Sequence, residues 1–227
     1  MKLRRIFGSQ QISIYDAGSG YGQYTYFMAT HMQPCTIYSV DIKEKWINDS
    51  REFFRRRDIK NVRFGIEDLT AIDHKNKFDI ITCIDVMEHI EDDKRVFANF
   101  SDSLKKGGYL LINSPSIYGG SDVHGEEEES FIGEHARDGY SKEDLEQKLH
   151  PVGLSTYKAN YTYGFWGDIA WRLGIKYPMV MLNASKIFFI VLPFYYLVTF
   201  LFTFGMMYLD FKSNNKVGSG INFIAKK

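Results

Sequence analysis

The chain has 227 residues, which is enough for one domain with a sizeable core. Its 28 basic and 28 acidic residues balance, so no overall positive field favours a nucleic-acid partner. Its two cysteines lie far apart and outside any C-x-x-C motif, which argues against a disulfide framework or a zinc site and fits a reducing cytoplasm. The basic segment Met1 to Phe7 precedes no apolar run, so we expect no signal peptide.

Strand and helix signals alternate along the chain, which predicts a doubly wound α/β sheet. The run at 78–84 is almost entirely apolar, as a central parallel strand buried on both faces requires. The expected strands are 12–16, 36–42, 61–66, 78–84, 109–113, 154–160 and 220–225. Helices are expected at 23–32, at 44–57, at 92–105 with a glycine stop at Gly107-Gly108, and after the capping-box-like Ser141.

The turn after the first strand carries glycines at alternate positions, Gly18, Gly20 and Gly22. Glycine lets the backbone turn sharply and approach a ligand closely. A dinucleotide site of the G-x-G-x-x-G type needs a third glycine where this chain has Gln23. The pattern present, D-x-G-x-G-x-G beginning at Asp16, resembles motif I of the class I S-adenosylmethionine (SAM) dependent methyltransferases. An ordinary glycine-rich turn is the alternative.

That resemblance gives the acidic residues at the next strand ends a role. A carboxylate at Asp16 beside bare loop amides suits the amino and carboxylate groups of SAM. Asp41, about 20 residues past the glycines, suits the ribose hydroxyls, and Ile42 suits the adenine ring. Asp68 resembles the family's acidic contact to the adenine amino group. Each aspartate can instead be an ordinary turn former.

The segment IDVMEH at 84–89, followed by LKKGGYLL at 104–111, resembles the ubiquinone-biosynthesis type of methyltransferase. The resemblance covers roughly residues 12–157. It implies a Rossmann-like, seven-stranded, mostly parallel sheet with an antiparallel last strand, and a place for Asp85 in the cofactor site. In quinone O-methyltransferases the matching acidic, Glu and His positions can hold a divalent metal. Here the corresponding residues are Asp85, Glu88 and His89. We favour no metal, with Glu88 and His89 capping and orienting the helix behind the SAM pocket.

Two histidines are candidates for a general base. The loop at 133–141 resembles the loop that lies near the acceptor in quinone-type relatives, and it contains His135. Histidine titrates near neutral pH and can take a proton from an acceptor hydroxyl. His135 is the first candidate and His89 the second. The alternative for His135 is a loop residue that orders a turn.

The last quarter of the chain differs from the rest. Residues 161–171 are densely aromatic, and 187–209 is an uncharged run long enough to span a bilayer. A single crossing would separate the last strand from its sheet, and Pro193 interrupts the run. We expect a core at 1–160, a helical cap or membrane-docking insert at 161–210 and a returning strand at 211–227.

Three placements of the uncharged run stay open: a dip into one leaflet, a buried lid or dimer face, or a true span. The first two favour an apolar acceptor such as a lipid, a quinone-like ring or a lipid-linked intermediate. The sequence thus predicts a SAM-dependent methyltransferase in the cytoplasm, at the inner face of the membrane if the run docks there. The alternatives are a catalytically inactive SAM-binding scaffold or membrane-associated interaction protein, and a nicotinamide-dependent reductase.

Overall fold

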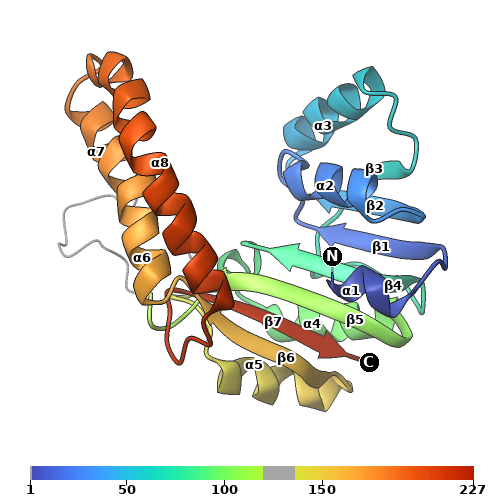
Figure 1. The fold of residues 1–227 in the computed structure, drawn as a ribbon. Helices are drawn as coiled ribbons and strands as arrows, with labels where there is room; N and C mark the ends of the chain where they lie inside the picture. The colour runs from blue at the N-terminus through green and yellow to red at the C-terminus, as the bar shows by residue number, and fades with distance from the viewer. Residues whose placement is uncertain (1, 120–135) are drawn as a thin grey trace.

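The chain folds around one seven-stranded sheet with the order β3-β2-β1-β4-β5-β7-β6 (Figure 1). The structure, a computed structural model, describes residues 2–119 and 136–227. Strand β7 runs antiparallel to both of its neighbours, and the pairs among β1 to β5 are parallel. The strands are β1 (Ile12–Ala17), β2 (Cys35–Asp41), β3 (Val62–Ile66), β4 (Phe78–Ile84), β5 (Leu104–Pro115), β6 (Ser155–Thr162) and β7 (Gly220–Lys226). This topology confirms the predicted fold class.

Helices cover both faces of the sheet, and β4 contributes to the core on each side. Ile80 packs in the cluster with Met28 and Phe54, whereas the next residue, Ile81, packs in the cluster with Phe97. Alternate side chains of a strand point to opposite faces, so an apolar central strand fills both cores. The elements of the sheet domain are α1 (Lys2–Ile6), α2 (Gln23–His31), α3 (Glu44–Arg56), η1 (Met87–His89), α4 (Asp93–Ser103), α5 (Lys142–Leu149) and η2 (His150–Val152).

The predicted glycine stop of the fourth helix is wrong. Helix α4 ends at Ser103, and Gly107 and Gly108 lie inside β5. Leu104, the residue after the end of α4, is fully buried and pairs with Phe78, so the chain enters the sheet three residues before Gly107. Gly107 has a φ of +79° where the β4–β5 register shifts, so the freedom of glycine serves a strand irregularity.

A helical hairpin rises from the edge of the sheet next to β6 and β7 (Figure 1). We call residues 165–212 the arm. It consists of α6 (Phe165–Trp171), the π-helix η3 (Arg172–Lys176), α7 (Tyr177–Ala184) and α8 (Phe188–Lys212). Asp210 closes the base of the arm. Its buried carboxylate accepts hydrogen bonds from the backbone N–H groups of Tyr163, Gly164 and Gly167 and from the Asn215 side chain.

Helix α8 runs without a break through Pro193. The expectation that this proline interrupts the helix is therefore wrong. A proline inside a helix removes one backbone hydrogen bond. Two adjacent tyrosines tie this part of α8 to the π-helix: Tyr195 donates to the Leu173 carbonyl at 2.7 Å and Tyr196 to the Gly174 carbonyl at 2.9 Å. Within the described residues, α8 is one helix long and apolar enough to cross a membrane by length and composition.

Candidate cofactor site

The glycine turn at the end of β1 uses its glycines for two different reasons. Gly18, Gly20 and Gly22 all have a positive φ, between +54° and +73°, which side chains rarely adopt. A Cβ on Gly18 would meet the Val86 side chain at 2.3 Å. A Cβ on Gly20 would meet nothing within 4 Å. Gly18 is therefore needed because a side chain there would clash with Val86. At Gly20 the missing side chain leaves the backbone exposed to open space.

Asp41 ties the end of β2 to this turn. Its Oδ2 accepts the Gly20 N–H at 2.8 Å, and its Oδ1 accepts the Lys43 N–H at 2.9 Å. Each carboxylate oxygen has a second lone pair, so two further donors such as ribose hydroxyls can bind. The neighbouring Ile42 is 64% exposed, an apolar surface next to a carboxylate. Both residues lie at the carboxyl edge of the sheet, where such folds bind ligands.

Asp16 is held inside the protein. Its oxygens accept the hydroxyls of Thr25, on α2, at 2.5 Å and of Thr82, on β4, at 2.8 Å. Burial raises the pKa of this carboxyl, and the two threonine hydrogen bonds act in the opposite direction. Asp16 thus joins the start of α2 to β4 directly behind the glycine turn. Its contact with SAM stays a prediction.

Ser19, between the first two glycines, is a residue that sequence reasoning missed. Its hydroxyl is buried and is one of four buried side-chain polar atoms in the described chain without a hydrogen-bond partner. A buried polar group without a partner costs about 1–3 kcal/mol. Ser19 lies within the glycine turn, so its hydroxyl is next to the predicted cofactor site. The only signal in the sequence is its place inside the glycine motif.

Asp68 is exposed beyond the end of β3 and forms its own turn. Its Oδ1 accepts the backbone N–H and the hydroxyl of Thr70, at 2.9 and 2.7 Å. This is the geometry of an aspartate turn. It agrees with the turn-former alternative and leaves a contact with adenine as a prediction.

The segment after β4 gathers three titratable residues. Desolvation raises the pKa of Asp85 to about 6, and the Glu88 carboxylate adds to the rise, whereas His89 opposes it. Asp85 also has a φ of +55°, unusual for a residue with a side chain. Glu88 is buried and accepts the Ser114 hydroxyl at 3.0 Å. In the part of the chain that the structure describes, no group of three or more His, Cys, Asp or Glu residues could hold a metal ion.

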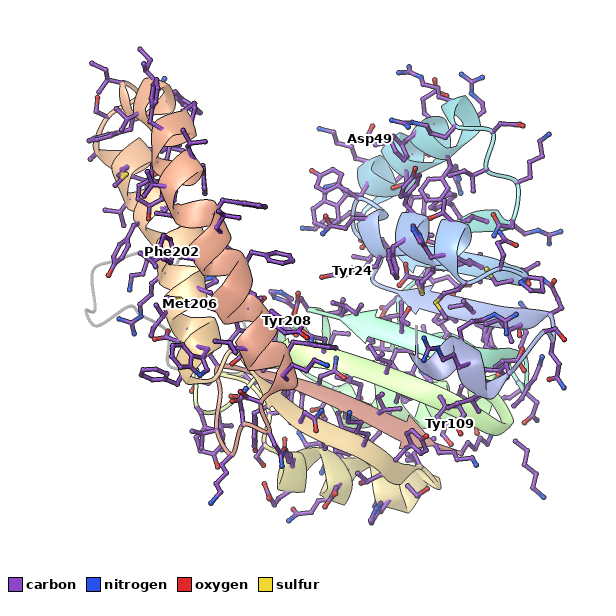
Figure 2. All side chains as sticks on the ribbon, in the orientation of Figure 1. Tyr24, Asp49, Tyr109, Phe202, Met206 and Tyr208 are labelled. Atoms are coloured by element: carbon purple, nitrogen blue, oxygen red, sulfur yellow. The ribbon has the colours of Figure 1, made fainter. Side chains whose placement is uncertain are left out.

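Tyr24 is a second residue that sequence reasoning missed. It lies in the first turn of α2, on the side that faces the arm (Figure 2). Burial raises the pKa of its hydroxyl, and the nearby charges of Asp85 and Tyr163 raise it further. Three elements therefore bring polar groups together beside the glycine turn: α2, the end of β4 and the connection from β6 to the arm. Nothing local in the sequence links these positions.

His135 lies outside the described residues. The residue after it, Ala136, donates its N–H to the Glu88 carbonyl at 2.8 Å. Arg137 then forms an ion pair with the buried Asp93 and donates to the Ile90 carbonyl. The chain thus returns from the undescribed segment against η1, next to His89.

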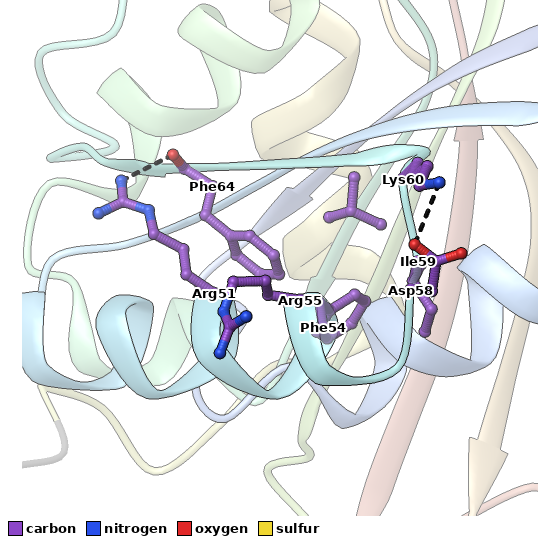
Figure 3. Close-up of a pocket in the computed structure, with 8 residues that line it drawn as sticks. Arg51, Phe54, Arg55, Asp58, Ile59, Lys60 and Phe64 are labelled. Atoms are coloured by element: carbon purple, nitrogen blue, oxygen red, sulfur yellow. Dashed lines mark hydrogen bonds and ion pairs between the residues drawn. The ribbon is translucent and has the colours of Figure 1, made fainter.

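One surface hollow of about 350 Å³ lies away from this site, between the end of α3 and the start of β3 (Figure 3). Arg51 and Phe54 line it from α3, and Lys60 and Val62 line it from the β3 side. The amino end of β3 is at the opposite edge of the sheet from the glycine turn, so this hollow does not belong to the predicted site.

Comparison with known proteins places the chain in a family. The family described as "Methyltransferase domain" matches residues 9–158. A protein named ubiquinone biosynthesis O-methyltransferase, from Coxiella burnetii (strain Dugway 5J108-111), is 26% identical over 118 residues, 49% of each chain. The chain thus spans about half the length of the curated relatives it matches.

Two solved structures share the fold over nearly the whole chain. Phosphoethanolamine N-methyltransferase 2 of Haemonchus contortus, in complex with SAM, has a TM-score of 0.67 at 16% identity, over 99% of this chain and 51% of that one. The [4+2]-cyclase SpnF has a TM-score of 0.66 at 14% identity, over 100% of this chain and 80% of that one. The strand order, the glycine turn and the family match lead to one conclusion: the chain belongs to the methyltransferase domain family and has the fold of the class I SAM-dependent methyltransferases.

Proposed function

We propose that the chain is a SAM-dependent methyltransferase. The glycine turn carries this proposal: Gly20 is bare and open, Asp41 holds it from the next strand, and the buried Ser19 hydroxyl has no partner among the described residues. The bound cofactor would supply a methyl group already activated by its sulfonium. The residues proposed for cofactor binding are Asp16, Gly18, Gly20, Gly22, Asp41, Ile42, Asp68 and Asp85.

The chain's own task is to align the acceptor and exclude water. Tyr24 interacts electrostatically with Asp85 and Tyr163, which supports an acceptor path to the glycine turn past these three residues. An oxygen acceptor needs a group that removes its proton, and the proposed bases are His135 and His89. His89 lies close enough to the Asp85 and Glu88 carboxyls to lower the pKa of both, against the larger effect of their burial.

We further propose an apolar acceptor, such as a lipid, a quinone-like ring or a lipid-linked intermediate. Tyr163 supports this proposal because it lies near Tyr24 and also lines an apolar hollow of about 230 Å³ at the base of the arm. Trp171, Phe200 and Met207 contribute to the same hollow. The curated relative named for ubiquinone biosynthesis agrees with this chemistry. A cytoplasmic location and a homodimer belong to the proposal as well.

The test is turnover of SAM to S-adenosylhomocysteine by the purified chain supplied with a membrane lipid extract and a panel of phenols. We expect turnover that depends on an apolar acceptor. SAM binding without turnover across the whole panel would favour the inactive scaffold instead. SpnF shares this fold and is named as a cyclase, so the fold alone does not establish methyl transfer.

A further inference from the structure

The exposed side of α8 is apolar over more than half of its circumference. Its outward residues include Ile190, Phe194, Leu197, Leu201, Phe202 and Phe204, all at least 60% exposed. At about 100° per residue, the exposed apolar positions cover an arc of about 220°. No charged residue occurs from Ile187 to Leu209.

This breadth favours lipid over a second copy of the chain. A helix that pairs with another protein buries a narrower apolar stripe and keeps polar residues on its other face. The inward side of α8 already packs on the first half of the arm, where Thr203 approaches Gly174 and Asp210 approaches Gly167. The remaining surface has no charged residue from Ile187 to Leu209, which is the pattern of a helix in contact with lipid.

The charges of the arm complement an anionic surface. Between Tyr163 and Lys212 there are four basic and two acidic residues, although the whole chain has no net charge. One acidic residue, Asp210, is buried at the base, and the other, Asp168, pairs with Arg172 at 2.9 Å. Anionic headgroups attract basic residues near a membrane surface.

The positions of these cations set the orientation. Lys212 is at the base of the arm, Lys176 is midway along its first half, and Lys186 is in the turn at its tip. Charged heads avoid the hydrocarbon, although long basic side chains can reach back to the headgroups. All three cations stay at headgroup depth only when the arm lies along the membrane surface.

We propose that the arm docks lengthwise into one leaflet of an anionic lipid bilayer, with the outer face of α8 among the acyl chains. This placement keeps both ends of the hairpin on the side of the sheet domain, so β7 can pair with β5 and β6 without crossing a membrane. It brings the apolar hollow at the base of the arm next to the lipid.

The first test is flotation of the full chain with vesicles of phosphatidylcholine, alone or mixed with phosphatidylglycerol. We expect binding that is strongest with phosphatidylglycerol, and a loss of about tenfold or more when Leu197→Glu is combined with Leu201→Glu. Both side chains are at least 75% exposed, so the fold does not depend on them. The control is Ile6→Glu, an exposed apolar residue on α1, which should bind vesicles as the wild type does.

The second test measures depth. The native cysteines are buried, so single cysteines at Ile190 and Phe204 can be labelled selectively with a nitroxide. The two sites lie about 21 Å apart along α8, and a lengthwise arm predicts equal depth for both. A much deeper label at Ile190 would overturn the lengthwise orientation.

Two further results would overturn the proposal as a whole: no binding to either vesicle, or a stable dimer in solution that Leu197→Glu dissociates. Neither measurement involves methyl transfer. A failure here is therefore separate from a failure of the proposed enzyme activity.

Discussion

Asp41 gives the sharpest test of the cofactor site. In the substitution Asp41→Asn one of the two side-chain acceptors becomes an NH2 donor, while the size of the side chain is kept. The two backbone N–H groups that Asp41 now accepts, those of Gly20 and Lys43, cannot both keep a good partner. The change should therefore act on the stability of the turn and on the affinity for SAM at the same time.

The two effects have different sizes. Loss of one acceptor for a backbone N–H should lower the free energy of unfolding by about 1–3 kcal/mol. A ribose hydroxyl that loses a hydrogen bond to a charged group should cost about 1.5–3 kcal/mol of binding, which raises the Kd for SAM about 10- to 150-fold. Urea denaturation measures the first effect, and isothermal titration calorimetry with SAM measures the second.

The matched control is Asp49→Asn, the same chemical change at an exposed position on α3 (Figure 2). It should alter neither quantity by more than about 0.5 kcal/mol. If Asp41→Asn lowers stability but binds SAM like the wild type, Asp41 only shapes the turn, and the ribose role is refuted.

Three other predictions follow from the same geometry. Gly20→Ala should cost about 1–2 kcal/mol of backbone strain in urea denaturation and weaken SAM binding, whereas Gly18→Ala, which meets the Val86 side chain, should lower the thermal midpoint further. The pKa of Asp85 is raised to about 6, so the folded state favours the protonated carboxyl. The stability that this proton contributes is present at acid pH and is lost as the pH rises through about 6. Thermal midpoints measured from acid to neutral pH should fall accordingly, and Asp85→Asn should flatten that fall. Asp210→Ala should lower the free energy of unfolding by about 2–4 kcal/mol, because several buried donors lose one charged acceptor; an unchanged urea midpoint would refute its role at the base of the arm.

The sequence alone was sufficient for the sheet and the glycine turn because both depend on local patterns. An apolar run flanked by turn residues specifies a central strand such as β4, and alternating strand and helix signals leave few topologies. Gly18, Gly20 and Gly22 stand out because few residues other than glycine accept their backbone angles. Local signals failed at Gly107, where the same residue type serves either a helix end or a strand irregularity.

Tertiary structure decided what the side chains at that site do. Only the packing of α2 and β4 shows that Asp16 is buried between Thr25 and Thr82, and only the turn's surroundings show that the Ser19 hydroxyl has no partner. The electrostatic interaction between Tyr24 and Asp85 joins residues about 60 positions apart, beyond the reach of any periodicity. The arm is the clearest case: the uncharged run at 187–209 left a buried, a spanning and a docking helix open. The hairpin fold shows that the apolar face of α8 lies outside the core of this chain and that the chain then returns to β7.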